Sequence, residues 1–186
     1  MPKPPKIKNP EYTRIFLLIV EGNNRQNQIL KKMDISEGEL KNKLSYLHNY
    51  FKFINCNLKR ARGVRATYSV NYNGIIQYML TEIVGVSGIN GEMPQIEKSL
   101  QNYFEDYINL TKPDGINRGF HVESGTGIPS MFKLLESFIL AIAEEFDNKE
   151  LIFNDAEYKF CVACYDYKIK KEGIYWQLAR DSLKQE

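Results

Sequence analysis

The residues with the clearest chemistry are cations and short polar side chains between positions 40 and 81. This window contains no Asp or Glu. Its basic side chains are Lys41, Lys43, Lys52, Lys59, Arg60, Arg62 and Arg65. Solvated surfaces normally mix both signs of charge, so an acid-free run of this length indicates contact with phosphates. The alternative to phosphate contact is that the arginines lie on a hairpin tip that is only solvated.

Next to Lys41 and Lys43 stand residues that hydrogen-bond base edges or phosphates, namely Asn42, Ser45, Tyr46 and Asn49. The sequence predicts that one helix over residues 36–50 presents all of them. Ser36 and Glu39 have capping-box spacing, which starts helices. Apolar residues then recur at helical spacing, at Leu40, Leu44, Leu47 and Phe51. We therefore expect the polar set, with Gly38, on the opposite face.

After this helix the hydrophobic period changes from 3.6 to 2. Residues 65–72 alternate and are rich in β-formers, and residues 53–62 are a more polar partner strand. Arg62-Gly63-Val64-Arg65 supplies the turn, because Gly63 can adopt a positive φ. The pattern predicts a β-hairpin with a cationic tip, followed by a helix over residues 74–82.

Two shorter helices are expected upstream, over residues 11–21 and 25–33, with a tight turn at Asp34-Ile35. Three helices are thus followed by a hairpin and by a polar, Gly-containing turn before the next helix. This order of elements resembles the winged helix-turn-helix superfamily, MarR- and ArsR-like in outline, over residues 10–83. The resemblance implies that helix 36–50 enters the major groove and that wing 59–65 contacts the DNA backbone. Repressors of this family usually dimerise through helices that flank the DNA-binding unit.

Charge divides the 186-residue chain into two unlike halves. Residues 1–83 carry 14 Lys/Arg and 6 Asp/Glu, a net charge of +8, whereas residues 84–186 carry 11 and 17, a net charge of −6. Residues 84–91 are glycine-rich and form the expected boundary. We expect a Pro/Lys-rich arm over 1–10, a winged-helix domain over 11–84, and an acidic domain over 92–186 for dimerisation, partner contact or effector sensing.

The second half should be mainly helical, which makes the fold class α+β. Amphipathic patterns predict helices over 94–108 and 130–146, with a long loop over 111–129 between them. Apolar, β-branched and aromatic residues indicate strands over 151–153 and 158–167, although residues 159–166 could instead form a buried helix. Gly173 is expected to interrupt the chain before a last helix over 174–183.

Two motifs in this half could do other chemistry. Cys161-Val-Ala-Cys164 has the spacing of zinc and redox sites, but the only imidazoles, His48 and His121, are not paired at ligand spacing. Packed thiols are the favoured reading. His121, Glu123 and Ser124 precede Gly125-Thr-Gly127, which could cradle an anion. Because no Walker Lys-Ser/Thr follows, a connecting loop is favoured.

We therefore predict a non-enzymatic, sequence-specific protein that binds double-stranded DNA, most simply a transcription regulator. No cofactor and no metal are expected. The sequence has three cysteines and no recognisable signal peptide, and its longest apolar run is residues 15–20. These features predict a cytoplasmic, nucleoid-associated location without a membrane span. The expected partners are DNA, a second copy bound through the C-terminal half, and a protein or small-molecule effector.

Three alternatives stay open. A replication or partition protein of a mobile element would have the same sequence features. A winged helix inside a larger complex could use the basic wing to bind an acidic protein. An enzyme would have its site around His121, Glu123 and Cys164.

Overall fold

The structure, a computed structural model, describes residues 9–57, 66–111, 128–148 and 153–184. Its N-terminal part begins with α1 (Pro10–Val20) and α2 (Gln26–Leu30). The third helix is α3 (Glu37–Ser45), which continues into a π-helical turn, η1 (Tyr46–Tyr50). The predicted start of this helix is confirmed, because the Ser36 hydroxyl accepts a hydrogen bond from Glu39 N at 3.1 Å.

The predicted hairpin is present as a short antiparallel pair, β1 (Ile54–Asn57) and β2 (Thr67–Val70). Ile54 is opposite Val70, and Asn57 is opposite Thr67. The hairpin is fixed to the helices by a hydrogen bond of 2.8 Å from Tyr68 N to Asn24 O, in the α1–α2 turn. The expected turn, 62–65, lies outside the described residues.

The chain then forms α4 (Tyr72–Tyr78) and a second π-helical turn, η2 (Met79–Val84). The Asn71 side chain caps α4 by accepting from Gly74 N at 3.2 Å. Gly74 is required here by space, because a Cβ at this position would lie 1.9 Å from Lys52 O. Gly85 ends η2 in the left-handed region, with φ of 79°.

Helices make up the described C-terminal half, as α5 (Pro94–Thr111), α6 (Met131–Asn148) and α7 (Asp155–Lys184). The predicted helices over 94–108 and 130–146 are confirmed. The prediction of a strand over 158–167 is wrong, and the buried-helix alternative is right. Phe160, Cys161 and Cys164 are fully buried at helical spacing along one face of α7. This face of α7 packs against α6, and that packing outweighs the local β propensity of the segment.

One buried carboxylate joins the starts of α5 and α7. Glu157 is 1% exposed, and its Oε2 accepts from Gln95 N at 2.7 Å and Ile96 N at 3.1 Å. Its Oε1 accepts from Asn154 N at 3.2 Å, while Asn154 Oδ1 accepts from Glu157 N at 2.8 Å. This reciprocal pair is a capping box for α7. A single side chain therefore caps two helices whose first residues are about sixty positions apart.

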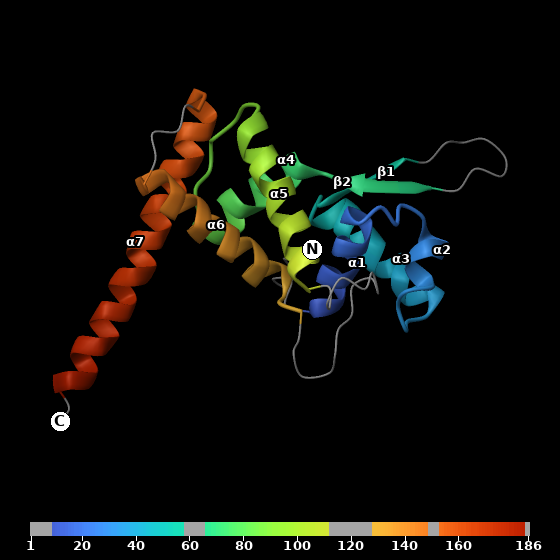
Figure 1. The fold of residues 1–186 in the computed structure, drawn as a ribbon, viewed down its shortest axis with the longest axis horizontal. Coiled ribbons are helices and arrows are strands. Elements are labelled where there is room, and N and C mark those ends of the chain that lie inside the picture. The colour runs from blue at the N-terminus through green and yellow to red at the C-terminus, as the bar shows by residue number, and fades with distance from the viewer. Residues whose placement is uncertain (1–8, 58–65, 112–127, 149–152, 185–186) are drawn as a thin grey trace.

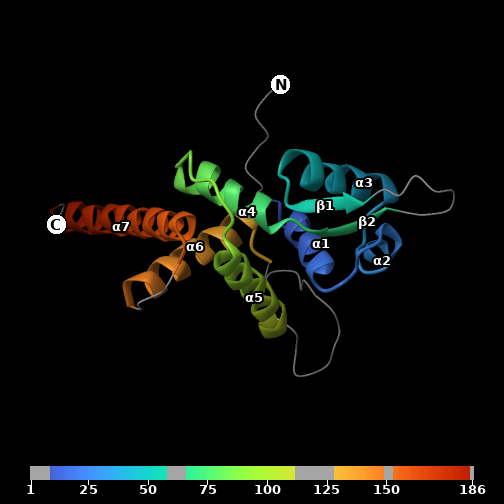
Figure 2. The same cartoon turned by 90° about the horizontal axis from the view of Figure 1, so that it is seen from above.

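A continuous core runs from α1 to α7 and crosses the expected domain boundary. Phe16 of α1 contacts Phe53 beside the hairpin, with ring centroids 6.4 Å apart, and Phe104 of α5, with ring centroids 4.9 Å apart. Figure 1 shows the α2–α3 region and the C-terminal end of α7 at opposite ends of the long axis. Figure 2 shows the same separation from above.

The prediction that Gly173 interrupts the helix is wrong, because α7 continues through it. A Cβ at Gly173 would have no atom within 4 Å, and glycine costs a helix interior about 1 kcal/mol relative to alanine. We expect Gly173→Ala to raise the free energy of unfolding by about 0.5–1 kcal/mol, measured by urea denaturation. A loss of stability would mean that the helix is not continuous here.

Candidate nucleic-acid interface

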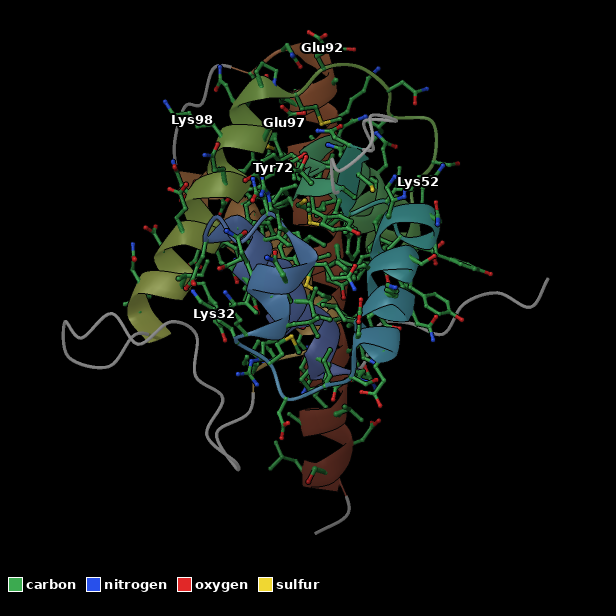
Figure 3. All side chains as sticks on the ribbon, turned by 90° about the vertical axis from the view of Figure 1, so that its right-hand side faces the viewer. Lys32, Lys52, Tyr72, Glu92, Glu97 and Lys98 are labelled. Atoms are coloured by element: carbon green, nitrogen blue, oxygen red, sulfur yellow. The ribbon has the colours of Figure 1, made fainter. Side chains whose placement is uncertain are left out.

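The predicted polar face of helix 36–50 is exposed. Leu40, Leu44 and Leu47 are at most 2% exposed on the inner side. Asn42, Ser45 and Asn49 lie on the opposite side and are exposed. Asn49 Nδ2 donates to Ser45 Oγ at 3.1 Å, which orients the Asn49 amide along the helix. Figure 3 shows the α3–η1 ribbon at an outer edge of the molecule, with side chains projecting from it.

Two tyrosines extend this face. Tyr46 is 44% exposed and Tyr50 is 37% exposed, with ring centroids 5.7 Å apart. Tyr46 also meets Tyr12 of α1 edge-on at 6.4 Å. Tyr46 was among the predicted site residues, whereas Tyr50 was not. The signal available for Tyr50 was its i+4 spacing from Tyr46. An aromatic ring can make apolar contact with a thymine methyl group.

The two predicted lysines of the helix are paired with acids from outside the acid-free window. Lys41 Nζ lies 3.5 Å from Glu37 in an exposed i,i+4 pair, which is weak and open to exchange. Lys43 Nζ lies 3.2 Å from Glu11 and 5.5 Å from the centroid of the Tyr12 ring, and its side chain is 18% exposed. Lys43 therefore holds α3 against α1, and Lys41 is the better placed of the two to contact a phosphate.

The helix ends in a π-helical turn, where Phe51 N donates to Tyr46 O at 3.0 Å. Lys52 follows with φ of 59°, in the left-handed region that usually requires glycine. Phe53 N then donates to Leu47 O at 2.9 Å, which closes the helix end. The left-handed Lys52 turns the chain directly into β1, so the polar face and the hairpin have a fixed mutual orientation.

The predicted wing cations Lys59, Arg60, Arg62 and Arg65 lie outside the described residues. The strand ends that flank them are described, and Asn57 pairs with Thr67 across the sheet. Inside the sheet, Tyr68 is opposite Cys56. Burial raises the pKa of Tyr68, and the neighbouring Cys56 adds to the rise. The phenol is therefore neutral at physiological pH and acts in packing.

The other predicted chemistry gains no support from the described residues. Cys161 and Cys164 are both fully buried on α7. Burial, with smaller effects of Glu157 and Glu145, raises the pKa of Cys161 to about 12, and burial raises the pKa of Cys164 well above its usual value. Within the described ranges no three His, Cys, Asp or Glu side chains form a metal-binding group. The predicted loop residues His121, Glu123 and Ser124 lie outside these ranges.

A cleft of about 480 Å³ lies where the α1–α2 turn meets α5. Its lining is largely polar and includes Glu21, Asn23, Lys32, Glu105 and Asn109. Residues from both halves of the chain line it.

Among the helices in the described ranges, none combines the length and the apolar character needed to cross a bilayer. No family model, curated protein or solved structure matched the chain.

Proposed function

We propose that this protein binds double-stranded DNA in a sequence-specific way and regulates transcription as a winged-helix homodimer. The observation that carries the proposal is the exposed face of Asn42, Ser45 and Asn49, on a helix that follows a tight turn and precedes an antiparallel hairpin. Helix-turn-helix proteins insert such a helix into the major groove. Amides there can pair with adenine, and hydroxyl groups can pair with any base.

The charge distribution supports separate roles for the helix and the wing within the interface. Glu37 neutralises Lys41, and Glu11 neutralises Lys43, so the described helix face is polar rather than basic. In this proposal base reading comes from the helix. Most of the phosphate affinity comes from Lys59, Arg60, Arg62 and Arg65 of the wing, with Lys3, Lys6 and Lys8 of the arm.

The test begins with selection of a preferred duplex from genomic fragments. Asn42→Ala and Asn49→Ala should each weaken binding to that duplex by about 1–3 kcal/mol and change binding to random DNA little. Asn102→Ala, an exposed asparagine on α5, is the matched control and should change neither. If the ratio of specific to random affinity is the same in all three variants, this face does not read bases.

The wing is tested by salt dependence in the same titrations. Arg62→Ala and Arg65→Ala should weaken binding to every duplex similarly, and each should reduce the salt slope by about one unit. If the salt slope is unaltered as well, the domain binds protein rather than DNA. The positions of selected fragments, at promoters or at replication origins, separate a transcription regulator from a replication or partition protein.

A further inference from the structure

The apolar stripe of α7 continues beyond the part of the helix that other elements cover. Phe160 and Cys164 are fully buried and Tyr167 is half-buried, with spacings of four and three residues. The same alternation of spacings then reaches Lys171, Ile174, Leu178 and Asp181. Ile174 is 61% exposed and Leu178 is 59% exposed. Both Figure 1 and Figure 2 show this part of α7 standing clear of the other elements.

The point where α7 leaves the body is fixed by three side chains. Glu136 of α6 accepts a hydrogen bond of 2.5 Å from Tyr167 OH and pairs with Lys171 Nζ at 2.5 Å. Burial of Glu136 acts to raise its pKa, but Lys171 and Tyr167 outweigh it, and the pKa is lowered. Beyond Lys171, residues 172–174 and 177–183 are all exposed. The projecting segment therefore starts from a defined position and direction.

We propose that the stripe Lys171, Ile174, Leu178 and Asp181 packs against the same stripe of a second copy, with the two helices antiparallel. These positions alternate as a and d of a heptad repeat. In an antiparallel pair each a position meets a d position, so Ile174 meets Leu178 of the partner subunit. Lys171, which also pairs with Glu136 of its own chain, then lies opposite Asp181 of the partner subunit at both ends of the contact.

Charge complementarity selects this arrangement over a parallel pair. In a parallel pair each residue faces its own copy, which would put Lys171 against Lys171 and Asp181 against Asp181. Like charges at such contacts disfavour that orientation. In sequence, segment 172–183 has three charged residues, Glu172, Arg180 and Asp181, so two copies are not held apart by net charge. The interface deepens the proposed homodimer by assigning its surface and orientation.

The contact is short, with two apolar layers between two ionic ones. A dimer held by it alone should be weak, with a dissociation constant of about 1–100 μM, and should be reinforced when both copies sit on one DNA site.

Disulfide trapping tests the orientation. In a Cys56→Ser background, Ile174→Cys and Leu178→Cys are made on chains of distinguishable size, while the buried Cys161 and Cys164 stay in place. Upon oxidation the mixture should give the mixed dimer, and each variant alone should stay monomeric. In the antiparallel pair, positions 174 and 178 of the two copies face each other at one level. Two positions 174 are offset by about 6 Å along the axis in addition to the separation between the helices, which puts them beyond disulfide reach.

Leu183→Cys is the matched control, since it is 71% exposed on the outer side of the same helix and should not cross-link. Cross-linking of each single variant with itself, without the mixed dimer, would show a parallel pair and overturn the proposal. Equal cross-linking of Leu183→Cys would show random collision and overturn it too.

Analytical sedimentation provides a second test of the interface. Asp181→Lys places Lys against Lys171 of the partner subunit and should weaken self-association at least tenfold. Glu172→Lys makes the same change of charge outside the stripe and should leave self-association unchanged. A wild-type chain that is monomeric at 100 μM, or equal behaviour of the two variants, would overturn the proposal.

DNA binding separates failure of this interface from failure of the proposed function. Asp181→Lys should still bind a duplex with one half-site and lose only tight binding to paired half-sites. If the wild-type chain dimerises as proposed and binds no DNA, the proposed interface is supported and the proposed DNA-binding function is contradicted.

Discussion

Gly74→Ala should lower the free energy of unfolding by about 3 kcal/mol, at the upper end of the range for an overpacked core. The added Cβ would lie 1.9 Å from Lys52 O and 3.0 Å from Lys52 C. Both are backbone atoms, so no side-chain rotation can relieve the overlap. The backbone there is also held by a hydrogen bond of 2.8 Å from Asn71 N to Phe53 O. Denaturant unfolding monitored by circular dichroism measures the loss.

The matched control is Gly38→Ala in α3, where a Cβ would have no atom within 4 Å. Both glycines lie inside helices, where alanine is favoured by up to about 1 kcal/mol. Gly38→Ala should therefore stabilise the protein while Gly74→Ala destabilises it. Equal effects of the two substitutions would contradict the close approach between Lys52 and α4.

Glu157→Gln should destabilise the protein by about 3 kcal/mol, because hydrogen bonds to a buried charge contribute about 1.5–3 kcal/mol each. The carboxylate accepts three backbone N–H groups with its two oxygens. An amide has one accepting oxygen, so its NH₂ group would face at least one backbone donor. Glu157→Ala would leave all three donors without this acceptor.

Asp155→Asn is the control, since Asp155 stands in the same first turn of α7 but its side chain is 83% exposed and pairs with Lys159 at 3.0 Å. It should change stability by less than about 1 kcal/mol. Chemical denaturation gives both values, and hydrogen exchange at Gln95 and Ile96 localises the effect. A Glu157→Gln variant as stable as Asp155→Asn would contradict the shared cap.

Local periodicity was sufficient to predict most helices from the sequence. The stripe of Leu40, Leu44 and Leu47, with the Ser36 cap, predicted α3 and the side that it buries. The exposed positions of Asn42, Ser45 and Asn49 followed from the same spacing. The antiparallel hairpin was also predictable, because its alternation has a different period.

The features that were missed depend on contacts distant in the chain. Tyr158 to Tyr167 has strand-like composition, and its packing on α6 favours the helix. The Asn154–Glu157 capping box was the local signal that could have corrected this. The pairing of Lys43 with Glu11 joins two helices, so spacing within either one does not show it. Gly173 is different, because a Cβ there would have no neighbour within 4 Å and no contact explains why the helix continues through it.

The burial of Cys161 and Cys164 gives the molecule an internal chemical reporter. Alkylating reagents react with thiolates, and a thiol with a pKa of about 12 is almost entirely protonated in neutral solution. These two sulfurs become reactive only when α7 separates from its neighbours, whereas Cys56 in the hairpin is partly accessible. The alkylation rates at the two places therefore report separately how often the helical core and the hairpin open, without any added label.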